Sequence, residues 1–277
     1  MPTTRNKILK ILAKTTLGLL ILIIGYYFFW IFPRYSVPIL TYHSFDYEDG
    51  LISVTPENFE RQMRYLKDKS FNVIPLDEFV AGIKNRRRFT HNTVVLTIDD
   101  GCKNNFIYAY PILKKYGFPI MIFLITNRIG TDADFLSWDE VKEMSKHNIS
   151  FGGHTKSHTY LPSVDKKDVL WDEISGCKKA IEEHVGRPVD YFCYPFGGFT
   201  EEAEKLVKKA GFKGACVTNH GFAILDRIGL YELSRISVRN DNQNFLFSDF
   251  INSIIFRVKL SGYYNLWRAK KQEIKQP

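Results

Sequence analysis

Short apolar segments alternate with amphipathic segments along most of the sequence, and this alternation restricts the fold more than any other feature. The apolar segments have the length of strands and are apolar throughout, whereas the segments between them repeat apolar residues at helical spacing. Such strands are typical of a parallel sheet covered by helices. The segments predicted to be strands are 37–43, 71–75, 93–99, 119–126, 149–155, 190–197, 214–219 and 233–238.

About eight strand–helix units favour a closed or nearly closed β/α barrel over an open α/β sheet, which is the alternative. The segments predicted to be helices are 55–70, 76–85, 104–118, 137–148, 166–186 and 200–212. Barrels of this kind keep their chemistry at the carboxyl ends of the strands. The polar or special residues at predicted strand ends are His43, Asp99, Asp100, His154 and Pro195.

Positive charge is concentrated at the two ends of the chain. Of the formal net charge of +8, residues 1–34 and residues 251–277 each carry +5, so residues 35–250 carry −2. A nearly neutral body with basic ends favours a position beside a membrane over a phosphate-binding face. We therefore expect no nucleic-acid partner.

An uncharged segment from Thr15 to Pro33 is close to the ~20 residues that cross a bilayer. Four basic residues precede it and one follows, which predicts an amino terminus in the cytoplasm and the rest of the chain outside. Its far end contains Tyr26, Tyr27 and Trp30, a poor context for signal cleavage. We favour a signal anchor in the cell membrane, crossing once, over a cleaved signal peptide.

The chain then divides into four predicted parts. They are a short basic cytoplasmic segment (1–14), the transmembrane anchor (15–33), the folded domain (34–240) and an amphipathic tail rich in aromatic and basic residues (241–277). The tail is predicted to pack against the barrel, with a position on the membrane surface as the alternative. The cysteines have no CxxC spacing, which argues against a zinc ribbon and leaves their pairing open: Cys102, Cys177, Cys193 and Cys216.

Two motifs at strand ends point to a metal site. LTIDDG, residues 96–101, places Asp99 beside Asp100, and GGHTKSH, residues 152–158, places His154 four positions before His158. Either motif alone is more often structural, but on one tight turn two such imidazoles reach a single divalent metal ion. One Asp then serves as the third ligand, and the other is free to accept a proton from an activated water.

These residues resemble a known family. TIDDG, HTKSH and YFCYPFGG are similar, in order and spacing, to the first three motifs of the polysaccharide deacetylases with a NodB-type domain, carbohydrate esterase family 4. PILTYHSF and LSRISV resemble its membrane-associated branch, which acts on exopolysaccharides such as poly-N-acetylglucosamine. The resemblance covers roughly residues 36–240. It implies a distorted (β/α) barrel and a divalent metal, most often zinc, with Co²⁺, Ni²⁺, Mn²⁺ or Fe²⁺ as alternatives.

The resemblance also implies roles for individual residues. Asp99 corresponds to the general base, and the metal ligands correspond to Asp100, His154 and His158. The backbone N–H of Phe196 corresponds to a donor for the tetrahedral oxyanion. The other residues of this substrate and oxyanion loop are Tyr194, Pro195 and Gly197.

The sequence departs from the family pattern at two places. The third motif often carries an Arg that pairs with the base; this chain has Cys193 there, and Arg235 is our candidate for a positive charge near Asp99. The fifth motif usually carries a His that protonates the leaving amine, and the corresponding ELSRISV has none. His43 is our candidate for the general acid or a substrate contact, with a structural core histidine as the alternative; His220 is a weaker candidate.

We therefore predict a membrane-anchored, metal-dependent hydrolase with an extracytoplasmic catalytic domain. Its partner is an acetylated extracellular or cell-wall polysaccharide, from whose N-acetylated sugars it releases acetate. The alternatives are an O-acetyl esterase or peptidoglycan deacetylase, and a catalytically weak or inactive glycan-binding relative. The two departures favour the binder, whereas the intact base and metal-ligand positions favour the enzyme, because a binder has no need of the base.

Overall fold

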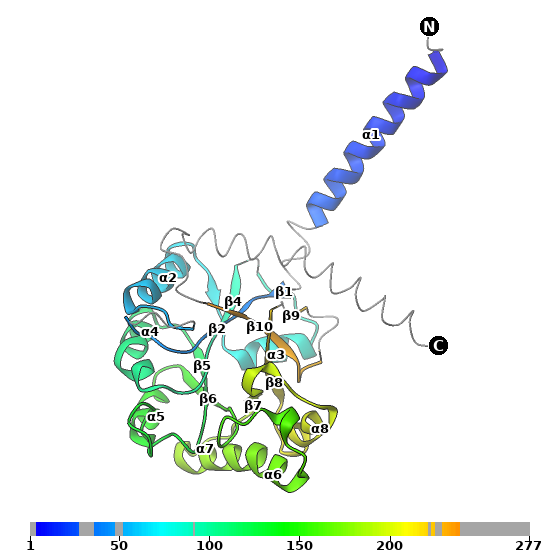
Figure 1. Ribbon diagram of the computed structural model, residues 1–277. Coiled ribbons are helices and arrows are strands. Elements are labelled where there is room, and N and C mark those ends of the chain that lie inside the picture. Colours follow the sequence, from blue (N-terminus) through cyan, green and yellow to red (C-terminus); the bar gives the residue numbers. More distant parts are fainter. Residues whose placement is uncertain are drawn as a thin grey trace.

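The computed structural model describes residues 4–27, 36–47, 52–90, 92–220, 223–224 and 229–238. Within this part of the chain, seven parallel strands form a closed barrel with helices on its outside (Figure 1). In order around the barrel, they are β2 (Ile39–Tyr42), β4 (Thr93–Ile98), β5 (Ile120–Leu124), β6 (Ile149–Gly153), β7 (Tyr191–Cys193), β8 (Gly214–His220) and β10 (Leu233–Ser237). Because β2 pairs with both β4 and β10, the predicted barrel is confirmed and the open sheet is excluded.

The other strands are short and lie beside the barrel. The segment predicted at 71–75 forms β3 (Asn72–Val73), which pairs with the first two residues of β4 only. β1 (Ser36–Val37) pairs in the antiparallel direction with β9 (Ala223–Ile224). The predicted strands therefore all exist, but the barrel closes with seven of them because β3 is too short to extend along a neighbour.

The barrel strands are apolar on both faces because they separate two hydrophobic cores. In β4, Val94, Leu96 and Ile98 pack toward the helices, whereas Val95 packs inside the barrel. The same alternation runs around the barrel. The strand residues of the inner core are Ile39, Val95, Met121, Phe123, Tyr191, Cys193, Cys216 and Leu233.

The inner core changes from apolar to polar along the barrel axis. α3 (Leu76–Lys84) follows β3, and its Phe79 and Ile83 belong to the inner core, so α3 covers the end where β4 begins. Toward the carboxyl ends of the strands, the inward positions are instead polar and buried: Thr41, Thr97, Asp99 and Arg235. The functional site therefore lies at this second end, as expected for such barrels.

The helices end where the sequence indicates. α2 begins after Thr55 and α8 after Thr200, and the side chain of each threonine accepts a backbone N–H of the helix that it caps. α4 and α7 end at Gly117 and Gly186, both with the left-handed backbone that glycine adopts freely. The bounds are α2 (Pro56–Asp68), α4 (Tyr110–Tyr116), α5 (Trp138–Met144), α6 (Lys167–Trp171), α7 (Cys177–Val185) and α8 (Glu201–Lys209).

Two of the segments predicted to be helices contain a π-helical turn. In the segment 104–118, the π turn η3 (Asn105–Ala109) precedes α4, because Pro111 has no N–H to continue the regular α-helical bonds. In the segment 166–186, the π turn η5 (Asp172–Gly176) separates α6 from α7. No proline lies there, and the contacts of this turn are described below.

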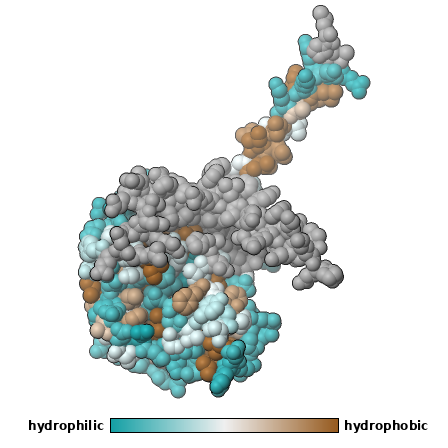
Figure 2. Space-filling view, viewed as in Figure 1, coloured by the Kyte–Doolittle hydropathy of each residue, from teal (hydrophilic) through white to brown (hydrophobic). Residues whose placement is uncertain are grey.

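The amino-terminal helix α1 (Thr4–Tyr26) is long and apolar enough to cross a membrane, a property that signal sequences share. Its basic side chains lie in its first half, and its second half exposes aliphatic side chains to the surroundings (Figure 2). The rest of the predicted anchor, including Trp30, and the predicted tail at 241–277 lie outside the described residues. The four cysteines, all described, are free thiols.

Candidate metal centre and catalytic base

The turn after β4 separates the two adjacent carboxylates. Side chains alternate along β4, so Asp99, two positions after the inward-facing Thr97, also points into the barrel; it is 2% exposed. Asp100 and Gly101 then both adopt positive φ, of 73° and 77°. At Gly101 a Cβ would lie 2.6 Å from Leu124 Cδ2, so only glycine fits the turn. This turn directs Asp99 into the barrel and Asp100 toward the loop after β6.

Asp100 meets both histidines of the HTKSH motif. Its Oδ1 lies 3.5 Å from His154 Nε2 and 3.5 Å from His158 Nε2. The three candidate ligand atoms all lie within 4.8 Å of one another. The structure therefore brings together the three residues that the sequence predicted as metal ligands.

A carbonyl oxygen fixes the orientation of His154. His154 follows the last residue of β6 and is 2% exposed. Its Nδ1 lies 2.8 Å from the carbonyl oxygen of Cys193, a group that only accepts hydrogen bonds. Nδ1 therefore carries a proton and donates it, so Nε2, which faces Asp100, is the nitrogen that a metal ion would take. A ligating histidine is typically held through its other nitrogen in this way.

The trio fits a divalent metal ion. Ligand atoms about 2.1 Å from a tetrahedral zinc ion lie about 3.4 Å apart, close to the separations found here. Asp100 Oδ1 is buried and has no hydrogen-bond partner in the described structure, which is costly unless a cation meets it. Burial alone would raise the pKa of Asp100, but His154 holds that pKa below its usual value, so the carboxylate is available as a ligand.

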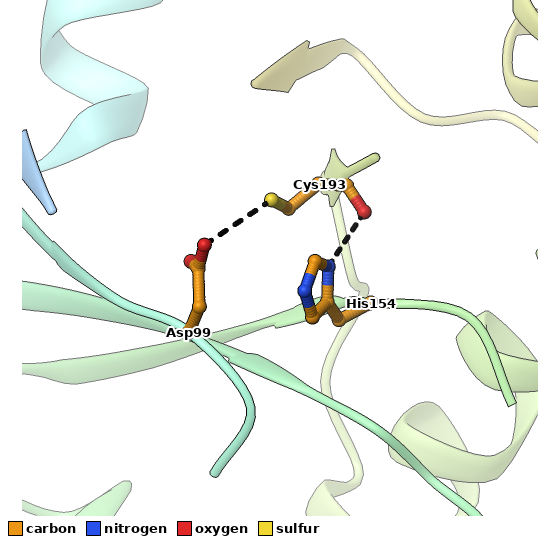
Figure 3. Close-up of side chains that lie close together, drawn as sticks. All are labelled: Asp99, His154 and Cys193. Carbon is orange, nitrogen blue, oxygen red and sulfur yellow. Dashed lines mark hydrogen bonds between the residues drawn. The ribbon is translucent and has the colours of Figure 1, made fainter. Parts of the chain in front are cut away.

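A second group of potential ligands, Asp99, His154 and Cys193, is a poorer metal site (Figure 3). Burial raises the pKa of the Cys193 thiol, so its sulfur stays protonated. His154 uses Nδ1 for the Cys193 carbonyl, and Asp99 uses both oxygens for Arg235. Cys193 instead contacts both Asp99 and His154. Its thiol lies 3.7 Å from Asp99 Oδ2, and its carbonyl oxygen accepts a hydrogen bond from His154 Nδ1.

Asp99 forms a buried ion pair with Arg235 of β10. The guanidinium donates from both terminal nitrogens to the two carboxylate oxygens, each at 2.6 Å. Arg235 is fully buried, and its remaining contacts include the hydroxyls of Thr41 and Thr97 at 3.0 and 3.2 Å and Cys193 Sγ at 3.0 Å. Arg235 thus supplies a guanidinium beside Asp99 from β10, whereas Cys193 of β7 occupies the position that often carries an arginine in the family.

This ion pair keeps Asp99 ionised. Burial alone would raise the pKa of Asp99, but the charge and hydrogen bonds of Arg235 hold that pKa far below its usual range. His43 Nε2 lies 3.7 Å from Asp99 Oδ2, at the mouth of the barrel, with its side chain 15% exposed. His220 ends β8 in register with Arg235, and its side chain lies outside the described structure.

The loop after β7 borders the metal centre. Phe196 has a left-handed backbone, with φ of 58°, is 66% exposed, and its ring centroid lies 4.7 Å from that of His158. Gly197 also has positive φ, and a Cβ there would lie 2.7 Å from the backbone nitrogen of Thr218. The loop therefore presents Phe196 beside the metal ligands only because the next residue is glycine.

The side chain of Tyr194 faces away from this site. It is fully buried in the outer core, where its ring stacks on Phe199 with centroids 4.6 Å apart. Its backbone holds the loop, because its N–H donates to the Cys216 carbonyl and its carbonyl accepts from Gly197 N–H. Pro195, which is also buried, follows it in the turn.

Unfavourable backbone conformations concentrate at this end of the barrel. Four residues other than glycine adopt positive φ around the site: Asp100, Thr155, His158 and Phe196. The other described examples, which follow helices or precede strands, are Ser70, Arg86 and Asn148. Such conformations persist only where surrounding contacts hold them, and they are frequent at active sites.

Sequence reasoning missed several supporting residues. Thr41 and Thr97 are polar residues at inward positions of apolar strands, a signal that marks them as partners of a buried charge. Thr155 Oγ1 accepts the His158 N–H at 2.9 Å, and Glu173 accepts hydrogen bonds from the loop that carries both histidines. Neither of these two stands out in the sequence.

Comparison with known proteins identifies relatives of this chain. The chain matches the polysaccharide deacetylase profile over residues 86–215. YxkH of Bacillus subtilis (strain 168), which is named after the same family, is 31% identical over 219 residues, 79% of this chain and 77% of YxkH. The poly-beta-1,6-N-acetyl-D-glucosamine N-deacetylase of Staphylococcus aureus (strain MRSA252) is 27% identical over 206 residues, 68% of this chain and 69% of that protein.

A solved structure extends the likeness to the whole barrel. The Streptococcus pyogenes deacetylase PplD, in complex with acetate, superposes with a TM-score of 0.73 at 26% identity. The superposition covers 79% of this chain and 98% of PplD. With the shared motifs, the closed barrel and the extent of these matches, the chain belongs to the polysaccharide deacetylase family.

Proposed function

We propose that this protein is a metal-dependent N-deacetylase that removes acetyl groups from N-acetylated sugars of an extracytoplasmic polysaccharide. One observation carries the proposal. An ionised buried carboxylate, Asp99, lies directly beside a carboxylate and two imidazoles suited to one divalent metal. A general base next to an open metal site is an arrangement that supports hydrolysis of an amide.

Each residue then has a distinct task. A divalent metal, most often zinc in this family, supplies a Lewis acid that polarises the acetyl carbonyl and acidifies a water. Asp100, His154 and His158 would hold it. Asp99 accepts the proton of the attacking water, and Arg235 keeps that carboxylate ionised and oriented for the task.

Two further groups complete the proposed reaction. The backbone N–H of Phe196 donates to the developing oxyanion. His43, within 3.7 Å of Asp99, is our candidate for the donor that protonates the departing amine. The products are acetate and a sugar amine.

The substrate class follows from the relatives and the mouth of the site. The Staphylococcus aureus relative is named for poly-beta-1,6-N-acetyl-D-glucosamine, which supports a polymer of N-acetylated glucosamine here. Phe196 and Tyr160 are exposed beside the metal ligands, with ring centroids 6.2 Å apart, and aromatic faces of this kind pack well on sugar rings. An O-acetylated sugar or peptidoglycan remains the alternative substrate for the same chemistry.

The activity is tested with the full-length protein in detergent. We expect acetate release from oligomers of N-acetylglucosamine, loss of activity on chelation, and recovery on adding Zn²⁺, Co²⁺, Ni²⁺, Mn²⁺ or Fe²⁺. O-acetylated and peptidoglycan fragments in the same mass-spectrometric panel separate the substrate classes. If no fragment loses acetyl with any metal, the enzymatic proposal is contradicted and the alternative of a glycan-binding relative is favoured.

We also propose that α1 is an uncleaved anchor with the barrel outside the cytoplasm. The cluster of basic residues at its amino end, and an apolar stretch near the ~20 residues that span a bilayer, support this orientation. Protease added to intact protoplasts is expected to digest the barrel and leave a short membrane-bound amino-terminal fragment. A barrel that is protected until the cells are lysed, or a mature chain that begins after α1, contradicts the anchor.

A further inference from the structure

The loop between β6 and η4 (Leu161–Ser163) carries both histidines, but it supports them differently. His154 directly follows the barrel strand and is fixed by the Cys193 carbonyl. His158 lies four residues further, in a loop with left-handed backbone at Thr155 and at His158 itself. Its position therefore depends on what holds the loop.

The carboxylate of Glu173 provides that support. Its Oε2 accepts the backbone N–H groups of Lys156 and Ser157, at 2.9 and 3.0 Å. Its Oε1 accepts the hydroxyls of Ser157 and Thr159. Four donors from the three residues that flank His158 thus converge on one carboxylate. Successive backbone N–H groups of this kind form a concave anion-binding site.

The negative charge of Glu173 is balanced by these donors. Glu173 is 9% exposed, and among the described residues it forms no salt bridge. The nearby Lys156 ammonium instead pairs with Asp172, at 2.7 Å. A buried carboxylate satisfied by hydrogen bonds alone loses that compensation if the loop moves, so the loop is held in one position.

The π turn η5 contributes to the same contact. Glu173 lies within η5, at the point where the predicted long helix departs from α-helical geometry. Gly176 of the same turn lies under the Lys156 side chain, and a Cβ there would be 2.7 Å from Lys156 Cδ. π-helical turns occur frequently at functional sites. Here the π turn packs closely against the loop that carries His158.

We propose that Glu173 is a positioning residue that places His158 for metal binding. The proposal rests on the proposed metal site, because it assigns Glu173 no contact with metal or substrate. Partners that hold a metal ligand in place typically change metal affinity about 10- to 100-fold when they are replaced. Asp172 is a matched control, because it is the neighbouring carboxylate of the same turn, and its ion pair among the described residues is with the Lys156 side chain.

The test measures Zn²⁺ affinity of the full-length protein by competition with a chromophoric chelator. We expect Glu173→Gln to weaken Zn²⁺ binding about 10- to 100-fold, because the charge is lost and one of the two accepting oxygens is replaced by a nitrogen that accepts no hydrogen bond. Asp172→Asn is expected to bind as the wild type does. In a His158→Ala background, Glu173→Gln is expected to have no further effect on affinity, because the positioned ligand is gone.

Each alternative outcome has a definite meaning. Wild-type affinity in Glu173→Gln, or the same loss with and without His158, overturns the positioning role. If Glu173→Gln does not fold, Ser157→Ala removes one donor to Oε1, and unchanged affinity in that variant rejects the proposal. If the wild type binds no Zn²⁺, or if Asp100→Asn does not abolish that binding, the proposed metal site is wrong. This outcome differs from a failure of the Glu173 proposal, in which the wild type still binds Zn²⁺ through Asp100.

Discussion

Asp99→Asn is expected to keep zinc at the wild-type stoichiometry while lowering acetate release about 10²- to 10⁴-fold, the usual contribution of a general base. The carboxamide fills the same space but accepts no proton from water. The metal ligands are separate residues, because the turn at Asp100 and Gly101 directs the ligand carboxylate away from the barrel interior. Metal content by mass spectrometry and acetate release on the same sample test both halves of this result.

The same substitution also has a structural cost that the experiment must separate from catalysis. Arg235 is fully buried, and without the Asp99 carboxylate its charge is uncompensated. Breaking one partner of a buried pair costs about 3–5 kcal/mol of unfolding free energy. We expect the double variant Asp99→Asn, Arg235→Met to recover much of that stability but none of the activity.

Two outcomes contradict the assignment of Asp99. Full activity in folded Asp99→Asn means that another group is the base, and loss of zinc in that variant means that Asp99 is a ligand.

Asp132→Asn is the control for carboxylate removal. Asp132 lies in the loop after β5, at the same end of the barrel, and pairs with Arg128 near the surface. It is expected to leave both metal and activity unchanged.

The barrel was predictable because a strand that is buried on both faces is apolar at nearly every position, which is easily recognised in a sequence. Segments such as 93–99 are apolar at every position, since their side chains alternate between the inner core and the helix layer. The convergence of the candidate metal ligands was predictable because strand ends meet at one end of a barrel, so residues distant in sequence lie close together there. β3 stays beside the barrel because it pairs through two residues only, and its segment gives no sign of that limit.

The support of the site was harder to predict. Glu173 is one of many acidic residues on amphipathic helices, and half of its partners are backbone N–H groups, which have no sequence signature. The π turn that carries it follows no proline. Arg235 was a better candidate, since an arginine within a short apolar strand needs a buried counter-charge, and Asp99 lies at the same end of the barrel.

The second large effect is expected at Arg235. Arg235→Met leaves the Asp99 carboxylate buried without its guanidinium, and we expect a loss of about 3–5 kcal/mol in unfolding free energy at neutral pH. Arg128→Met is the control. Arg128 also pairs with a carboxylate, at 2.7 Å, but its side chain is 56% exposed. Exposed pairs contribute about 0–1 kcal/mol, so this variant is expected to lose little.

The pH dependence of that loss distinguishes a charge effect from a packing effect. In the wild type, the pKa of Asp99 is lowered on folding, so its ion pair stabilises the protein above the unfolded pKa of about 4 and less as pH falls. Without Arg235, burial instead raises that pKa, so ionisation of Asp99 opposes folding at neutral pH. The deficit of the variant should therefore shrink as the pH falls from neutral toward about 4, where the variant is relieved of its buried charge, and further below that pH, where the wild type loses its ion pair.

Denaturant unfolding of metal-free protein between acidic and neutral pH measures this deficit directly. A deficit that is constant with pH assigns the loss to the vacated space of the guanidinium and rejects the charge interpretation. A deficit that shrinks on acidification shows that Arg235 acts by keeping Asp99 ionised, which is the state a general base requires. Because Arg235 comes from β10 rather than β7, that result also explains how a thiol at Cys193 is tolerated: the guanidinium reaches the same carboxylate from another strand of the barrel.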